Sequence, residues 1–252
     1  MIKTLINNIA FTISTFTQLP SFSIEFKREN TKYVYLILPF VGIIVGVITY
    51  IIIILLSNVI NEIFILSILL LVANILITGG IHFDGLLDSL DAFKSYRIKE
   101  EKLRIVKDPR VGAFALIYFT VIILLSLIAY FYVIKNGYFK TFLIIPVFSR
   151  ILLLFLINFN SLEKNDMLDS IWHISFKKYW WIFTLLYFTV CILLFPSIIT
   201  VLLFLVGLLY LIYYNKFFKR HFDNLNGDLC GYFIVTVELV MFLFMAIYII
   251  VI

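Results

Sequence analysis

Three aspartates lie close together in one short stretch of the sequence. Asp84, Asp88 and Asp91 are spaced i, i+4 and i+7 within the run GGIHFDGLLDSLDAF at 79–93. On a helix these positions fall within roughly 60° of one another, so the three carboxylates share one face. Three negative charges this close together repel one another. Mg²⁺ takes oxygen ligands and usually keeps waters and substrate phosphates, so it could bind all three carboxylates and offset their repulsion. The spacing predicts metal ligands, with a solvated acidic helix face as the alternative.

A candidate phosphate site follows along the chain, in the run KDPRVGAF at 107–114. Pro109 suits the first turn of a helix, and Asp108 suits its N-cap. A helix that starts here would aim free backbone amides at a ligand, with Lys107 and Arg110 beside them, an arrangement that favours phosphate. The alternative is a capped helix start with ordinary basic loop residues.

The composition indicates a membrane protein. The chain has 252 residues, of which 63% are hydrophobic and 14% charged, and it is too apolar for a soluble domain. We expect an all-α polytopic integral membrane protein with a single catalytic domain over 1–252. Apolar runs long enough to cross a bilayer as helices lie at 33–56, 60–78, 111–134, 141–158, 180–195, 197–214 and 231–252. We therefore predict about seven spans, of which the fifth and sixth could instead form one re-entrant pair.

The basic residues predict the orientation. If the N-terminus is cytosolic, every Lys and Arg outside the spans except Lys135 and Lys140 falls in a cytosolic segment. We expect an integral protein of the cytoplasmic membrane whose N-terminus and active site face the cytosol. The first 16 residues carry apolar side chains at helical spacing between Asn and Thr, which predicts an amphipathic helix on the cytoplasmic leaflet. The cytosolic loops also account for the net charge of +5, so no nucleic-acid partner is expected.

Four polar residues lie inside or just before apolar spans. Arg150 and Glu238 have similar depths in two spans, and an unpaired charge there would cost about 2.5 to 3.5 kcal/mol. We expect them to pair or to line a polar cavity open to the cytosol, with snorkelling of Arg150 as the alternative. Asn226 and Asp228 precede the last span, where they could make a turn and cap or contact metal or substrate.

These motifs resemble those of the cobalamin synthase family, the adenosylcobinamide-GDP ribazoletransferases. The likeness rests on the two runs above, FTQLP at 16–20, the pair Ser149-Arg150, and NGDLCG at 226–231 before a Glu-bearing last span. It extends in order from about residue 11 to residue 238. The chain departs from the family pattern at Gln18, where Arg is usual, and in a shortened last loop, which puts the role of the family's Thr there in doubt.

The resemblance implies transfer of a substituted phosphate group in the late steps of cobalamin (vitamin B12) biosynthesis. The ribose hydroxyl of α-ribazole, or of its 5′-phosphate, attacks the cobinamide-linked phosphorus of adenosylcobinamide-GDP; GMP leaves, and adenosylcobalamin or its 5′-phosphate forms. Mg²⁺ is the implied cofactor, with Asp84 and Asp88 as its ligands and Asp91 as a third ligand or the base. Residues expected to contact substrate or phosphate are Gly79, Gly80, His82, Lys107, Asp108, Arg110, Arg150, Asn226, Asp228 and Glu238. The implied partners are the corrinoid nucleotide, α-ribazole and the lipid bilayer, and the resemblance allows association with other cobalamin assembly enzymes and a homo-oligomer.

Three other classes stay open on the residues alone. A CDP-alcohol phosphotransferase also uses Asp-Gly clusters, but its pattern requires Ala-Arg where this chain has Asp88-Ser89. An aspartate-rich polyprenyl transferase needs a second metal motif, for which only the run from Asp223 to Asp228 is available. A transporter would use Arg150 and Glu238 as an ion relay and would not cleave a phosphoanhydride.

Overall fold

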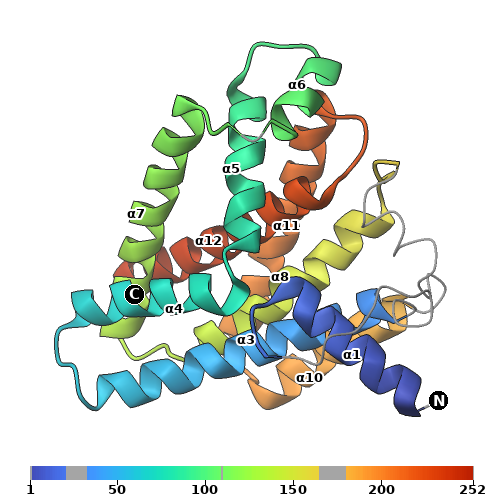
Figure 1. The fold of residues 1–252 in the computed structure, drawn as a ribbon. Helices are drawn as coiled ribbons and strands as arrows, with labels where there is room; N and C mark the ends of the chain where they lie inside the picture. Colours follow the sequence, from blue (N-terminus) through green and yellow to red (C-terminus); the bar gives the residue numbers. More distant parts are fainter. Residues whose placement is uncertain (1, 21–32, 109, 165–179, 252) are drawn as a thin grey trace.

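The computed structural model describes residues 2–20, 33–108, 110–164 and 180–251, and this part of the chain is mainly helical. Pro109 therefore lies outside the described residues. The helices are α1 (Ile2–Phe16), α3 (Val34–Ser57), α4 (Ile63–Thr78), α5 (Ile81–Lys94), α6 (Lys99–Val106), α7 (Ala113–Lys135), α8 (Thr141–Asn158), α10 (Trp180–Leu194), α11 (Ile198–His221) and α12 (Gly227–Val251). Figure 1 shows α5 between α7 and α11, with α12 crossing behind it. The all-α prediction is confirmed.

The apolar runs of the sequence all form helices, but fewer of them than seven qualify as spans. Among the described residues, five helices are long and apolar enough to cross a membrane, namely α3, α7, α8, α11 and α12. The bent pair α4 and α5 would make a sixth if it counts as one span. In the described part of the chain α10 has 15 residues, so there it does not reach the length of a span. The structure thus supports five or six spans.

Two glycines make the sharp bend between α4 and α5. Gly79 and Gly80 have φ angles of 64° and 73°, in the left-handed region that glycine enters without a steric penalty. The two helices meet at 93° as a result. A Cβ at Gly79 would overlap the side chain of Gln18, which lies two residues after the end of α1. The bend directs α5, with its carboxylates, away from the apolar helix α4.

Small residues let two pairs of helices approach closely. In α3, Gly42 and Gly46 lie against the backbone of α8 at Pro146 and Leu143, where an added Cβ would sit 2.5 Å from each carbonyl oxygen. This is the small-residue spacing of tightly packed membrane helices. In the second pair, Gly85 of α5 lies against the α12 backbone. The two contacts hold the polar residues of α8 and α12 close to the start of α5.

The N-terminal helix packs with a partly polar face turned inward. Asn8 and Thr12 are fully buried, and the Asn8 side chain accepts a hydrogen bond from the Tyr33 backbone N–H at 2.8 Å. Leu5 and Ile6, on the apolar stripe seen in the sequence, are about half exposed. The predicted amphipathic helix is therefore present. Its exposed apolar side chains agree with a face turned toward lipid.

Candidate active site

The carboxylates of α5 lie on a segment that bends away from the spans. α5 is not itself a membrane-spanning helix, because it has only 14 residues and three of them are aspartates. Asp84 is exposed and Asp88 is half-buried, one helical turn apart. The pKa of Asp88 is raised by partial burial first, and then by the negative charges of Asp84 and Asp91. The three acids therefore do repel one another, as the sequence spacing predicted.

Asp91 caps the next helix. Its carboxylate accepts hydrogen bonds from the backbone N–H groups of Gly112 and Ala115, the latter at 2.9 Å. α7 begins at Ala113 rather than at residue 109, so the predicted helix start and the N-cap role of Asp108 are wrong. The physical reason is that the Asp91 carboxylate supplies the anion that a helix N-terminus favours. Gly112 allows this contact, since a Cβ there would overlap the carboxylate.

Two backbone N–H groups at the start of α7 already donate to Asp91, and one of the two basic residues before this helix is bonded to Asp108. Arg110 is exposed and binds its neighbour Asp108 through two side-chain hydrogen bonds of 2.9 and 2.7 Å, and its backbone N–H also donates to Asp108. The hydrogen bonds from the Arg110 side chain are the main reason that the pKa of Asp108 falls to about 2. Lys107 is exposed. Asp91 and Asp108 thus occupy some of the donors that were expected to bind phosphate here, and the phosphate role of Lys107 and Arg110 stays a prediction.

A cavity of about 230 Å³ brings together carboxylates from two distant parts of the sequence. Asp84 of α5 and Asp228 of α12 both line it, together with His82. Asn226 lies just before α12 and accepts the Leu229 backbone N–H at 2.9 Å, so it caps that helix. Asn226 therefore makes the predicted cap, and Asp228 is a lining residue of the cavity.

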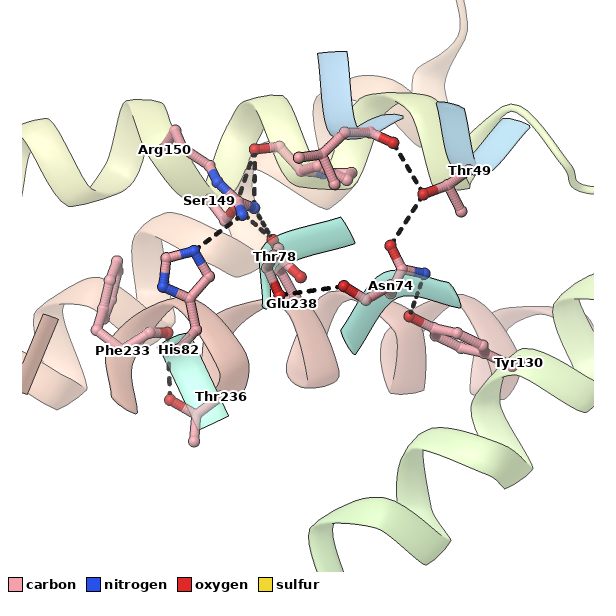
Figure 2. A network of polar contacts seen from close by, with 12 residues as sticks. Thr49, Asn74, Thr78, His82, Tyr130, Ser149, Arg150, Phe233, Thr236 and Glu238 are labelled. Carbon is pink, nitrogen blue, oxygen red and sulfur yellow. Dashed lines mark hydrogen bonds and ion pairs between the residues drawn. The ribbon is translucent and has the colours of Figure 1, made fainter. Parts of the chain in front are cut away.

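The intramembrane charges form an ion pair, which confirms one of the two sequence predictions. The Arg150 guanidinium contacts the Glu238 carboxylate, and Ser149 donates to the same carboxylate oxygen at 2.7 Å (Figure 2). Arg150 is 2% exposed and Glu238 24% exposed, so snorkelling of Arg150 is excluded. Breaking such a buried pair from one side costs about 3 to 5 kcal/mol, since it leaves an uncompensated charge.

His82 lies between this ion pair and the cavity. Its Nε2 atom is 3.3 Å from an Arg150 nitrogen, and Figure 2 shows the ring directed at Arg150. His82 and Arg150 also line a smaller inner cavity of about 50 Å³, whose walls include Asn74 and Tyr130. Asn74 accepts a hydrogen bond from Thr49 and donates to Tyr130, at 2.9 and 3.4 Å. His82 therefore connects the polar interior to the cavity of Asp84 and Asp228.

Sequence reasoning missed several of these residues. Ser149 was noted only as a neighbour of Arg150, and Asn74 and Tyr130 were not singled out at all. Their signal in the sequence is weak, because isolated polar residues in apolar helices often bond their own backbone. Gly85 and Gly231 were also passed over as packing residues, although each interrupts an otherwise bulky helix. A Cβ at Gly231 would sit 3.3 Å from the His82 Cα atom, tighter than most such contacts.

Comparison with known proteins decides the family. The family described as cobalamin-5-phosphate synthase matches residues 8–246, nearly the whole chain. The chain belongs to the cobalamin-5-phosphate synthase family. The match spans every residue of the cavity and of the buried ion pair described above. No solved structure matches the chain.

Curated members of the cobalamin-5-phosphate synthase family cover most of the chain. A protein of Lachnoclostridium phytofermentans named adenosylcobinamide-GDP ribazoletransferase is 32% identical over 93% of this chain and 91% of its own. One of Clostridium perfringens strain 13 with the same name is 31% identical over 91% of this chain and 93% of its own. A third protein with this name, from Clostridioides difficile strain 630, is 29% identical over 80% of this chain and 82% of its own.

The oxygen donors of this family member fit Mg²⁺ held by few protein ligands. No group of three or more His, Cys, Asp or Glu side chains within the described ranges is placed to hold a metal ion. Mg²⁺ is nevertheless commonly bound by one or two carboxylates together with waters and substrate phosphates. Asp84 and Asp88, one turn apart and in mutual repulsion, supply such a pair. The ligand role of Asp91 stays a prediction, since its oxygens already serve the start of α7.

Proposed function

We propose that the protein is a membrane-bound adenosylcobinamide-GDP ribazoletransferase. The observation that carries the proposal is the cavity shared by Asp84 and Asp228, in a chain that belongs to the cobalamin-5-phosphate synthase family. Its closely similar relatives bear the ribazoletransferase name. The substrates are then adenosylcobinamide-GDP and α-ribazole or its 5′-phosphate, and the second product is GMP.

The reaction exchanges one phosphorus–oxygen bond for another. The acceptor's ribose oxygen forms a bond to the cobinamide-linked phosphorus, and the bond from that phosphorus to the bridging oxygen breaks. GMP leaves with the bonding electron pair on its phosphate. The hydroxyl proton passes to a base. The chain must therefore hold two anionic or polar partners in line and accept one proton.

Separate residues supply these parts. Mg²⁺ held by Asp84 and Asp88 would neutralise the charge of the pyrophosphate. We assign proton acceptance to Asp228, because it lines the cavity from a different helix and lies outside the α5 acidic run. Asp91, which was the sequence candidate for the base, instead holds the start of α7 against α5. His82, held by the buried Arg150, is a polar contact on the cavity wall.

The buried ion pair has a positioning role in this proposal. Arg150 lines the inner cavity but is not among the residues of the cavity that holds Asp84. Its guanidinium contacts Glu238, Ser149 and His82. We therefore assign Arg150 to holding α8, α12 and the start of α5 together, rather than to direct contact with the pyrophosphate.

The membrane assignment extends the same proposal. The excess of Lys and Arg in one set of loops favours a cytosolic site in the cytoplasmic membrane. Purified protein supplied with adenosylcobinamide-GDP, α-ribazole and Mg²⁺ should release GMP and form adenosylcobalamin in equal amounts. Omission of α-ribazole should suppress both products. GMP release that does not depend on the acceptor, or no reaction with either form of the acceptor, would refute the proposed function.

A further inference from the structure

The cavity of Asp84 and Asp228 is lined by polar residues where the start of α5 contacts the start of α12, here called its polar end, and by apolar side chains from other helices, here called its apolar end. Its volume is about 230 Å³, and His82 accompanies the two carboxylates at the polar end. The apolar end is built by four helices that come together in the fold, α1, α3, α8 and α12. Its principal side chains are Phe16, Tyr35, Leu38, Leu153, Ile157 and Ile234. A ligand that fills this cavity must therefore have an apolar body and a polar attachment.

Two polar side chains at the apolar end offer little to a ligand, since Tyr35 is 2% exposed and the hydroxyl of Thr15 is bonded within the protein. Thr15 also lines the cavity, but its hydroxyl donates to the Phe11 carbonyl oxygen at 2.8 Å. Leu38, Leu153 and Ile157 are each at most 2% exposed, so the wall is well packed. A ligand with hydrogen-bonding groups on its buried face would lose water without gaining partners, which disfavours its binding.

The size and the apolar wall of the cavity suit some parts of the two substrates and not others. Guanine carries an amide and an amino group that the apolar wall would leave unpaired. A corrin ring with its amide side chains is too large and too polar for the cavity. The base of α-ribazole is a dimethylbenzimidazole, a flat apolar bicycle without a hydrogen-bond donor once it is joined to ribose. Among the substrate parts, this base has the shape and polarity that the cavity selects.

We infer that this cavity is the acceptor site, with the benzimidazole base of α-ribazole at its apolar end and the ribose beside Asp84 and Asp228. The inference rests on the proposed function and adds to it the substrate part that the cavity takes. The ribose hydroxyl then lies next to the carboxylates that hold metal and accept the proton. Phe16, at the end of α1, becomes a wall of the acceptor site, so the N-terminal helix contributes directly to specificity.

Filling the apolar end tests the inference. Leu153→Phe adds volume to a packed wall and so takes space from the ligand, and binding of α-ribazole should weaken roughly tenfold or more. The fluorescence of the benzimidazole reports this binding without turnover. A riboside with a single-ring imidazole base should bind the variant and the wild type alike. The KM for adenosylcobinamide-GDP should stay the same in both proteins.

A second apolar groove provides the matched control. It has a volume of about 450 Å³ and lies between α1, α3 and α10, with Leu36 and Tyr187 among its lining residues. Leu36→Phe adds the same side chain there and should leave α-ribazole binding unchanged. If Leu153→Phe fails to fold, Phe16→Ala removes one wall of the cavity from α1 and should weaken α-ribazole binding while the affinity for GMP stays constant.

The outcomes test the acceptor site and the proposed function separately. Unchanged α-ribazole binding in the folded Leu153→Phe or Phe16→Ala variant would overturn the acceptor site. So would a loss of affinity for GMP in place of α-ribazole, since guanine would then occupy the cavity. Binding of α-ribazole that depends on Leu153, in a wild-type protein that never releases GMP, would leave the acceptor site standing and refute the proposed function.

Discussion

Gly85 of α5 lies against Asp228 of α12 so closely that a Cβ at position 85 would sit 2.9 Å from the Asp228 Cα atom. The contact explains how two carboxylates far apart in the sequence reach one cavity. Asp84 is the neighbour of Gly85, and Asp228 is itself the residue in contact. In the pair Asp84-Gly85, the aspartate supplies a carboxylate to the cavity. The glycine has no side chain, and this lets α5 and α12 come into contact.

We expect Gly85→Ala to separate the two carboxylates. The added methyl group must push α12 away, which should destabilise the fold by about 1 to 3 kcal/mol and reduce turnover strongly. Val59→Ile is the control, because it also adds one methyl group, but to a side chain that is 81% exposed and does not line the cavity. Thermal unfolding in detergent and the rate of GMP release measure both effects. Equal behaviour of the two variants would contradict the close contact.

Asp88→Asn should stabilise the metal-free protein at neutral pH. The pKa of Asp88 is raised in the folded state, so its ionised form is disfavoured by folding above that pKa. This penalty is present at pH 7 and disappears as the pH falls through the raised pKa to below the ordinary value of 3.8. The difference in unfolding temperature between variant and wild type should shrink in that window.

Mg²⁺ should reverse the order of the unfolding temperatures of wild type and Asp88→Asn. Addition of Mg²⁺ should raise the unfolding temperature of the wild type, because the ion binds only the folded state, and should raise that of Asp88→Asn much less. Equal stabilisation of both proteins by Mg²⁺ would exclude Asp88 as a ligand. The exposed carboxylate of Glu101 on α6 offers the control variant Glu101→Gln, which should respond like the wild type.

The Arg150–Glu238 pair predicts non-additive stability changes. Arg150→Leu and Glu238→Leu should each cost about 3 to 5 kcal/mol, since each leaves the other charge buried alone. The double Leu variant should recover most of that loss. We expect its turnover to stay low, because His82 loses its Arg150 contact. Additive losses in equilibrium unfolding would show that the two side chains do not act as a pair.

The fold was largely predictable from the sequence, and the site was predictable only in part. Apolar runs specify α3 and α8 to within one residue and α7 to within about two, since helices must satisfy their backbone groups inside a bilayer, but α12 begins at Gly227, four residues before the predicted run. The start of α7 was not predictable from KDPR, because the competing cap comes from Asp91, 21 positions earlier than Gly112. The joint cavity of Asp84 and Asp228 depends on helix packing through Gly85, which no local pattern encodes.

The orientation of the protein predicts opposite labelling at two loops. Asn136 follows α7 and Tyr96 follows α5, and both side chains are exposed. Asn136→Cys should react with an impermeant thiol reagent added to intact cells, and Tyr96→Cys should react only after lysis. Cys191 and Cys230 are 7% and 5% exposed, so the native background should be low. The reverse pattern of labelling would place the candidate site outside the cytosol.

The most direct measurement is adenosylcobalamin formation by purified Asp84→Asn and Asp228→Asn, compared with wild type and Glu101→Gln. All four are assayed with adenosylcobinamide-GDP, α-ribazole and millimolar Mg²⁺, after thermal unfolding has shown that each is folded. The account predicts that wild type and Glu101→Gln form adenosylcobalamin and GMP in equal amounts, and that both aspartate variants lose nearly all turnover. Near wild-type rates in Asp84→Asn or Asp228→Asn would contradict an active site at this cavity.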